Sequence, residues 1–300
     1  MGTGVLWQPQ AARMSNPVAK DFADMPGLLY VVATPIGNLE DVTRRGVNVL
    51  SSVAKIAAED TRRTRVLLEA VGVKGPRLVP LHSHNEQAAS LSLLESLRAG
   101  DDVALVSDAG TPLLSDPGYG LVRACWSEGF GVVPVPGPSA LLAALSVSPI
   151  PCGRFYFEGF LPAKAAQRKE RLSALASLEM AVVFFEAPHR VASCLEDLAG
   201  LVPERRLMVG REMTKRHEQY LCDTPAAIHD LLVQQDRLRG EFVFVLEGCR
   251  EQAAPVEVRR TMETLCRELP PAQAARLGAQ LLGRKRRELY ELALSFSGPQ

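Results

Sequence analysis

The sequence predicts an α/β protein of two domains followed by a small C-terminal helical extension. Three observations lead to this prediction. The chain has 300 residues, a length that suggests about two domains. Between Leu28 and Val147 short apolar runs alternate with helical stretches, which is typical of a parallel sheet with helical crossovers. Beyond Phe155 the apolar runs are again rich in residues that favour strands, which indicates a second sheet.

The first domain is expected at residues 27–147, after a mobile N-terminal extension at residues 1–26 that shows no periodicity. Unbroken apolar runs suit parallel strands covered on both faces, and amphipathic stretches that end at glycine suit helices. The predicted strands are Leu28–Pro35, Val53–Asp60, Val103–Val106 and Gly131–Val135, and the predicted helices are Val42–Leu50, Ala89–Gly100 and Gly120–Glu128.

The second domain is expected at residues 148–250, after a linker at Ser146–Phe155 that is rich in proline and glycine. Its sheet could include antiparallel pairs. The predicted strands are Met180–Pro188, Arg206–Met213 and Gly240–Gly248, with a helix at Arg168–Leu178. Residues 251–300 form the predicted extension, with a hinge at Glu251–Arg260 and two short helices around Gly283, arranged as in a helix-turn-helix.

Composition narrows the class of protein. Lys plus Arg and Asp plus Glu each total 34, so no net charge steers the whole chain toward nucleic acid or a membrane. The six cysteines are scattered without C-x-x-C or metal-ligand spacing, which fits a reduced cytoplasmic compartment and predicts no bound metal. No apolar run reaches membrane-spanning length, and no secretion signal is expected. These features predict a cytoplasmic protein without a membrane partner.

The loop after Val103–Val106 has the most unusual composition in the chain. Its two acids, two glycines and two prolines are Asp108, Asp116, Gly110, Gly118, Pro112 and Pro117. Proline fixes φ and glycine allows positive φ, so the loop backbone is expected to hold one shape with its amides exposed. Because α/β sheets bind ligands at the carboxyl ends of their strands, this loop predicts a cradle for a small molecule.

Two further loops follow strands of the same predicted sheet, at Thr34–Asp41 and Pro136–Leu145. Ser139 can cap a helix whose free amides would favour a carboxylate or phosphate, but a capped helix after a rigid turn explains the same residues. The dinucleotide fingerprint G-x-G-x-x-G, the phosphate loop and the nucleophile elbow G-x-S-x-G are absent from the predicted turns. Dinucleotide oxidoreduction, phosphate-loop hydrolysis and serine hydrolysis therefore lose support.

Seven segments together carry a family resemblance. They are LYVVATPIGNLEDVTRR, AEDTRRT, LVSDAGTPLLSDPG, VPGPSALLAAL, VVFFEAPHRV, GREMTKRHE and GEFVFVLEG, in this order. They closely resemble the tetrapyrrole methylase superfamily of S-adenosylmethionine-dependent enzymes, and within it the bacterial 2′-O-ribose methyltransferases of small-subunit ribosomal RNA. The resemblance runs from Leu28 to Gly248, and Pro270–Leu294 is similar to the tail of that subgroup.

The resemblance implies the two-domain class III fold of S-adenosylmethionine methyltransferases, usually as a homodimer, with the cofactor between the domains. It implies 2′-O-methylation of a ribose in 16S ribosomal RNA of the small ribosomal subunit, at a cytidine of the decoding region. The cofactor positions that it implies are Pro35, Gly37, Asp108, Ala109, Gly110, Thr111, Pro112, Ser139, Ala140, Phe185, Glu186, Met213, Gly240, Glu241 and Phe242. Thr111 departs from the tetrapyrrole-acting members, which usually carry aspartate there, and this departure favours an RNA substrate.

The methyl transfer that the resemblance implies requires the methyl donor and the ribose hydroxyl to be aligned. A general base would speed this transfer, because a neutral hydroxyl is a weak nucleophile. The candidates for a catalytic role are Asp60, His84, Glu86, Glu186, Lys215 and His217. Each is explained equally well as a helix cap or a surface ion pair. The sequence therefore leaves the base unassigned.

Positive charge is clustered near the predicted cleft. Arginines that begin helices at a ligand-binding edge can pair with RNA phosphates. The RNA-binding candidates are Arg44, Arg62, Arg63 and Arg65. The basic clusters at Lys164–Arg171 and Gly283–Glu288 are interpreted as solvated helix faces.

Two alternative functions remain open. One is a methyltransferase of the same superfamily that acts on a tetrapyrrole or a protein side chain. The arginine cluster at Asp60–Arg65 and the helical tail argue against it. The other is a non-catalytic RNA-binding factor, against which the intact loop at Asp108–Pro112 argues.

Overall fold

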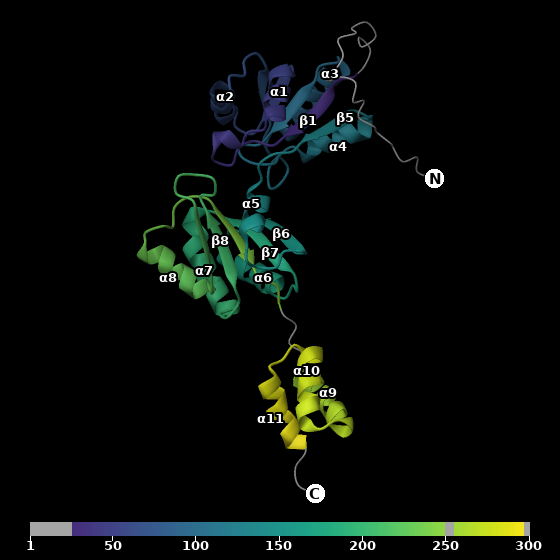
Figure 1. Ribbon diagram of the computed structural model, residues 1–300. Coiled ribbons are helices and arrows are strands. Elements are labelled where there is room, and N and C mark those ends of the chain that lie inside the picture. The colour runs from purple at the N-terminus through teal and green to yellow at the C-terminus, as the bar shows by residue number, and fades with distance from the viewer. Residues whose placement is uncertain (1–25, 250–254, 297–300) are drawn as a thin grey trace, which may run out of the picture.

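The computed structural model describes residues 26–249 and 255–296. In these residues the chain forms two five-stranded sheets and, at the C-terminal end, a group of three helices (Figure 1). The mobile extension expected at residues 1–26 lies outside the described residues except for Pro26.

The first sheet is entirely parallel, as predicted, with the order β3-β2-β4-β1-β5. Its strands are β1 (Leu28–Val32), β2 (Lys55–Ala58), β3 (Arg77–Pro80), β4 (Val103–Val106) and β5 (Gly131–Val135). The sequence analysis missed β3. This four-residue strand lies at the sheet edge and begins and ends with exposed residues, so it lacks the apolar run of the buried strands.

Helices cover both faces of the first sheet. The helices that follow its strands are α1 (Arg44–Ser52), α2 (Thr61–Ala70), α3 (Glu86–Arg98), α4 (Tyr119–Glu128) and α5 (Ala140–Val147), with a short 3₁₀ helix at Leu39–Asp41. Successive residues of β4 point to opposite faces. Leu105 packs in one core cluster with Leu93 and Leu121, whereas Val106 packs in the other with Leu50. This two-sided burial explains why β4 contains no polar residue.

The second sheet is mixed, with the order β6-β7-β10-β8-β9. Its strands are β6 (Phe155–Phe160), β7 (Ala181–Glu186), β8 (Leu207–Arg211), β9 (Gln219–Asp223) and β10 (Phe242–Leu246). The expected antiparallel pairs are confirmed for β10 with β7 and β8, and for β8 with β9. Phe155 begins β6, and α5 continues to Val147, so the predicted linker at Ser146–Phe155 is too long at both ends.

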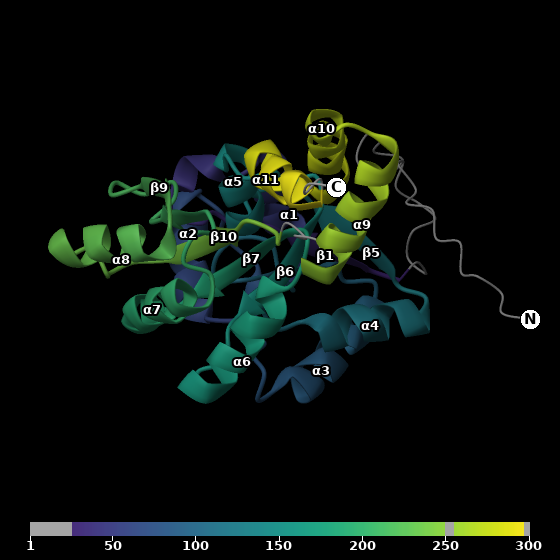
Figure 2. The same ribbon diagram turned by 90° about the horizontal axis from the view of Figure 1, so that it is seen from below.

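The two faces of the second sheet are covered by different parts of the chain (Figure 2). The helices α6 (Ala165–Ala176), α7 (Val191–Leu201) and α8 (Pro225–Gln234) cover one face, and a short 3₁₀ helix spans Pro188–Arg190. On the other face α5 packs through Leu141 and Ala144 against Val183 and Val243. Thus α5, which the sequence places at the end of the first predicted domain, contributes to the core of the second sheet and joins the two halves.

The last three helices have a core of their own. They are α9 (Pro255–Glu268), α10 (Pro271–Leu282) and α11 (Arg286–Phe296). Met262, Ala274 and Leu289 are buried together among them. The two helices expected around Gly283 are confirmed, and Gly283 ends α10 with a positive φ of 63°. The predicted hinge at Glu251–Arg260 is wrong from Pro255 onward, where α9 begins, and its first residues lie outside the described ranges.

Among the described residues, no helix combines the length and the hydropathy that crossing a membrane requires.

Candidate functional site

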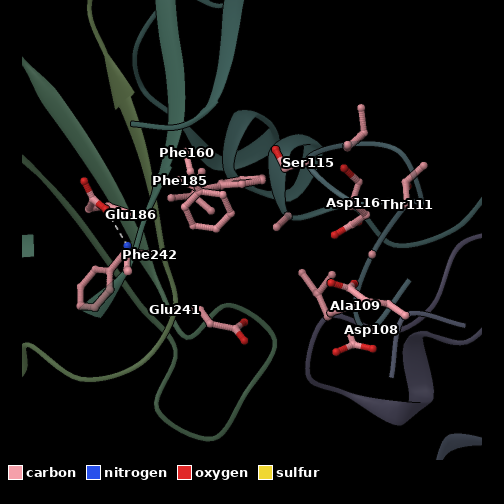
Figure 3. Close-up of a pocket in the computed structure, with 18 of the residues that line it drawn as sticks. Asp108, Ala109, Thr111, Ser115, Asp116, Phe160, Phe185, Glu186, Glu241 and Phe242 are labelled. Atoms are coloured by element: carbon pink, nitrogen blue, oxygen red, sulfur yellow. Dashed lines mark hydrogen bonds between the residues drawn. The ribbon is translucent and has the colours of Figure 1, made fainter. Parts of the chain in front are cut away.

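A cavity of about 410 Å³ lies between the carboxyl-terminal loops of the first sheet and the edge of the second (Figure 3). Its volume is within the range of small-molecule sites. Residues from both halves of the molecule line it: Ile36, Glu59, Arg63, Asp108, Ala109, Gly110, Thr111, Leu114, Ser115, Asp116, Ser139, Ala140, Phe160, Phe185, Glu186, Ala187, Pro188, Glu241, Phe242 and Val243.

The loop after β4 forms one wall and is held by hydrogen bonds. The backbone of Gly110 exchanges two hydrogen bonds with Thr34, at 2.9 and 3.0 Å between nitrogen and oxygen. Thr111 Oγ1 donates to the carbonyl oxygen of Pro138 at 3.1 Å, which ties the loop to the start of α5. Gly110 is buried with a φ of +84°, a conformation that favours glycine. These contacts fit the expectation of a loop held in one shape, but the amide of Gly110 is not exposed as predicted, because it donates to Thr34.

Carboxylates gather at this wall. Asp108 accepts a hydrogen bond from the backbone nitrogen of Asp60 at 2.9 Å and pairs with Arg63 at 3.2 Å. Burial and the charge of Asp108 raise the pKa of Glu59. Burial and the charge of Glu59 raise the pKa of Asp116 to about 6. The mutual repulsion of these carboxylates favours a positively charged ligand beside them.

The loop from Leu113 to Gly118, which carries Asp116, has an unusual backbone. Leu113 and Ser115 have φ values of +74° and +78°, which are uncommon for residues other than glycine. Glu86 at the start of α3 supports the loop, because its Oε1 accepts hydrogen bonds from the backbone nitrogens of Gly118 at 3.2 Å and Gly120 at 2.6 Å. Glu86 therefore caps α4 from a neighbouring helix and does not line the cavity.

The opposite wall is aromatic and belongs to the second sheet (Figure 3). Phe160 and Phe185 meet edge to face with ring centroids 5.5 Å apart. Beside them the buried carboxylate of Glu186 pairs with Arg190 through Oε1. Its other oxygen, Oε2, is buried without a hydrogen-bond partner in the described part of the chain. This wall suits a planar ring.

Lys215 links the two halves beside the cavity. Its Nζ lies 3.0 Å from carboxylate oxygens of both Glu212 and Glu241. A methyl group on Gly37 would lie 2.4 Å from Lys215 Cγ, so the lysine stem packs directly on the loop after β1. Partial burial favours the neutral amine, but the hydrogen bonds to the two carboxylates raise the pKa of Lys215 overall. A lysine held in its charged form is poorly suited to act as a base.

The cofactor positions implied by the resemblance divide into two groups. Those that line the cavity are Asp108, Ala109, Gly110, Thr111, Ser139, Ala140, Phe185, Glu186, Glu241 and Phe242. Those that do not line it are Pro35, Gly37, Pro112, Met213 and Gly240. Sequence reasoning did not assign a site role to Ile36, Glu59, Leu114, Ser115, Asp116, Phe160, Ala187, Pro188 or Val243. The acids, glycines and prolines of its loop could have indicated Asp116 as a site residue. Phe160 lies in a strand that was not predicted.

The catalytic candidates differ in whether they line the cavity. Glu186 is the member of that set that lines the cavity. Asp60 caps α2, and hydrogen bonds from Arg62 lower the pKa of this carboxyl to about 2. His84 and His217 are exposed and lie outside the cavity lining.

The RNA-binding candidates lie at the starts of two helices that follow the first sheet's strands. Arg44 begins α1, and the other three lie in the first turns of α2. All four are exposed. Arg63 also lines the cavity, whereas Arg62 turns back to pair with Asp60 at 2.8 Å. The described residues hold no group of three or more His, Cys, Asp or Glu side chains placed to bind a metal ion.

Comparison with known proteins places these features in a family. A family model described as tetrapyrrole (corrin/porphyrin) methylases matches residues 28–228, and a model described as the RsmI C-terminal HTH domain matches residues 252–297. The ribosomal RNA small subunit methyltransferase I of Xylella fastidiosa (strain Temecula1) is 48% identical over 88% of this chain and 98% of that protein. The enzyme of the same name from Escherichia coli O157:H7 is 44% identical over 91% of this chain and 96% of that protein.

Solved structures share the fold at lower sequence identity. The methyltransferase CobJ aligns with a TM-score of 0.56 and 20% identity, over 74% of this chain and 95% of CobJ. Uroporphyrin-III C-methyltransferase from Thermus thermophilus, complexed with S-adenosylhomocysteine, aligns with a TM-score of 0.51 and 17% identity, over 74% of this chain and 97% of that chain. These alignments show that the two-sheet architecture is that of known methyltransferases.

Proposed function

The chain belongs to the tetrapyrrole methylase family, and from that premise we propose that it methylates a ribose 2′-hydroxyl of small-subunit ribosomal RNA. The protein is an enzyme, and its methyl donor is S-adenosylmethionine. One observation carries the proposal: the similarity to the ribosomal RNA methyltransferases extends over nearly the whole chain, including the C-terminal helices. A tetrapyrrole-acting relative would account for the two sheets alone.

The residues of the cavity fit the donor. The cavity volume of about 410 Å³ suits a molecule of this size. The aromatic wall offers Phe160 and Phe185 to a purine. At the other wall Asp108 presents negative charge to a sulfonium.

The donor, when bound, supplies an activated methyl group, so alignment is the main task of the protein. The loop at Asp108–Thr111 is tied to Thr34 and Pro138 and offers a rigid wall for one end of the donor. Glu186 and the phenylalanines offer the other end a fixed orientation. Lys215 holds Glu241 and packs on Gly37, which supports the relative placement of the two walls.

We also propose which nucleotide of the ribosomal RNA accepts the methyl group. Exposed arginines at the start of α1 and α2 offer positive charge to RNA phosphates beside the cavity. A cytidine of the decoding region in 16S ribosomal RNA is the proposed target, within the small subunit, and the enzyme is proposed to act as a cytoplasmic homodimer. The names of the relatives support the small-subunit acceptor.

The test is methyl transfer from labelled S-adenosylmethionine by the full chain. The acceptors are small ribosomal subunits, free 16S ribosomal RNA, uroporphyrinogen III and total protein. We expect label in ribosomal RNA, and mass mapping should locate one 2′-O-methylcytidine. Label in the tetrapyrrole or in protein would replace the proposal with the corresponding alternative. Binding of RNA without any binding of the donor in calorimetry would indicate a non-catalytic factor.

A further inference from the structure

We propose that Asp116 is the base that receives the proton of the acceptor hydroxyl. This inference rests on the proposed methyl transfer. A neutral ribose hydroxyl is a weak nucleophile, and a positioned base whose pKa is near the working pH is the usual remedy. The acceptor must approach the methyl group within the cavity, so the base is expected among the carboxylates that line it. Those are Glu59, Asp108, Asp116, Glu186 and Glu241.

Cations or structural hydrogen bonds engage most of these carboxylates. Asp108 pairs with Arg63 and holds the backbone nitrogen of Asp60. Glu186 pairs with Arg190. Glu241 pairs with Lys215. A carboxylate oxygen that already accepts from a cation or a structural N–H is less free to receive a proton from the acceptor hydroxyl.

Glu59 and Asp116 remain, and Asp116 is the better placed of the two. Glu59 follows β2 (Lys55–Ala58) and belongs to the first half of the molecule. No basic side chain among the described residues pairs with Asp116. It is also carried on a loop that reaches the second half of the molecule. A methyl group on Gly159 of β6 would lie 2.9 Å from the Oγ of Ser115, the residue before Asp116.

The loop that carries Asp116 is held from outside the cavity. Its positive φ values at Leu113 and Ser115 are costly, and such strain persists only where the surroundings enforce it. Glu86 supplies that constraint through Gly118 and Gly120. Gly118 in turn has no room for a side chain, because a methyl group there would lie 2.7 Å from a methyl carbon of Leu105 in β4. The loop therefore presents Asp116 to the cavity in one conformation.

The groups that face Asp116 tune its protonation. Glu59 at the end of β2 and Asp108 after β4 are negative, and the nearby Ser107 hydroxyl partly offsets their effect on the pKa of Asp116. Burial and the Glu59 charge together raise the pKa of Asp116 to about 6. Arg63 on α2 is engaged with Asp108. At neutral pH Asp116 is thus charged yet more basic than an ordinary aspartate.

The step balances without another reagent. The acceptor oxygen forms a bond to the methyl carbon while the carbon–sulfur bond breaks, and the electron pair of that bond remains on sulfur. The hydroxyl proton passes to the carboxylate of Asp116 and then to water when the products leave.

The test compares Asp116→Asn, Asp116→Glu and Glu59→Gln with wild type, using purified small subunits and S-adenosylmethionine. Asp116→Asn should lower the single-turnover methylation rate at pH 8 by about a hundredfold or more. Donor affinity from calorimetry should change by less than about tenfold, which separates a base from a donor-holding charge. Asp116→Glu should restore part of the rate. Asp230→Asn, the same chemical change on exposed α8, is the matched control.

The pH profile provides a second readout. The kcat/KM of wild type for the donor should rise with pH through about 6 and then level off. Asp116→Asn should lose this rise, whereas Glu59→Gln should move it to lower pH because one repelling charge is removed. A merely structural role for Asp116 would lower the rate at every pH and leave the rise in place.

Thermal unfolding without donor or RNA gives a readout independent of activity. The pKa of Asp116 is higher in the folded protein than the ordinary 3.8, so its contribution to stability is complete below about 4 and is lost as pH rises through about 6. Between pH 4 and 7 the Tm of wild type should therefore fall relative to that of Asp116→Asn.

The outcomes separate this inference from the proposed function. If wild type methylates no ribosomal RNA, the proposed function fails. If wild type is active and Asp116→Asn keeps its rate and its pH rise, the function stands and the assignment of Asp116 is overturned. A large loss of donor affinity without a change in rate at saturation would overturn it as well.

Discussion

Individual carboxylates around the cavity have the same chemistry in the sequence but different partners in the structure. Asp60 caps α2 and is bound by Arg62, which lowers its pKa. Glu86 caps α4. Asp116 lacks such a partner among the described residues and has a raised pKa. Because partners decide the protonation state, a residue type and its neighbours in sequence do not suffice to assign a base.

Asp108→Ala should weaken binding of S-adenosylmethionine. The change removes a negative charge from the cavity wall and leaves the backbone nitrogen of Asp60 without its acceptor. We expect the Kd to rise about tenfold or more, which corresponds to ~1.4 kcal/mol. Calorimetry measures the Kd, and circular dichroism confirms that the variant is folded.

Asp230→Ala on exposed α8 is the control for this prediction, and an unchanged Kd in Asp108→Ala would contradict it. Gly110→Val is a poorer probe. The sequence suggests that this loop is exposed, but Gly110 is buried with a positive φ, so a valine there would strain the fold as well.

Substitutions of the arginines of α2 should differ in their effects on RNA binding and on donor binding. Arg62→Ala combined with Arg65→Ala should weaken RNA binding and leave donor affinity unchanged, because neither residue lines the cavity. For every arginine–phosphate pair that the substitutions remove, the slope of log affinity against log salt should become shallower by about 0.7 to 0.9. Arg63→Ala should also weaken donor binding, since Arg63 lines the cavity and pairs with Asp108. Filter binding at several salt concentrations, with donor calorimetry, makes the comparison. Equal effects of the two variants on donor affinity would refute the distinction.

Among the secondary-structure elements, the best-predicted strands are continuous apolar runs. The strands β4 and β5 have the bounds that the sequence predicts, since each is an apolar run between turn residues. The strands β3, β6 and β9 escape prediction, because exposed and half-exposed residues interrupt or replace such a run. The start of α9 resembles a hinge in the sequence because Pro255 interrupts it, although proline is well accommodated in the first turn of a helix.

Glu86→Ala should destabilise the contact between α3, which carries Glu86, and the start of α4. The change removes the acceptor for two backbone N–H groups at the start of α4, and we expect a loss of about 1–2 kcal/mol of stability. Hydrogen exchange of Gly118 and Gly120 should speed up, and the methylation rate should fall because the loop bearing Asp116 relaxes. Glu95→Ala, an exposed change on the same helix, is the control. Unaltered exchange at both glycines would show that the cap is unimportant.

The cavity is shared by the two sheets in the molecule as a whole. Asp108 and Thr111 belong to one half, and Phe185 and Phe242 to the other. The helix α5 runs between the halves, with Ser139 and Ala140 at the cavity and Leu141 in the core of the second sheet. A ligand in this cavity therefore contacts both halves at once.

Saturation with S-adenosylmethionine should protect both halves from unfolding. At a free concentration one hundred times the Kd, the gain is about 2.7 kcal/mol if only the folded state binds. Hydrogen exchange should slow in β4 (Val103–Val106) and β10 (Phe242–Leu246) together. Protection confined to one sheet would mean that the donor does not occupy the shared cavity.

The amino-acid sequence alone predicts the class of the fold and the alternation of parallel strands and helices in the first half, because apolar periodicity reflects burial directly. Its motifs also predict a ligand-binding loop after β4, since glycine and proline demand particular backbone angles, and Asp108–Thr111 of this loop line the cavity. Only the tertiary structure decided that α5 belongs to the second core, that Glu86 is a cap, and that Glu59 faces Asp116. These facts depend on contacts between residues far apart in the chain, and protonation and burial follow from such contacts rather than from local sequence.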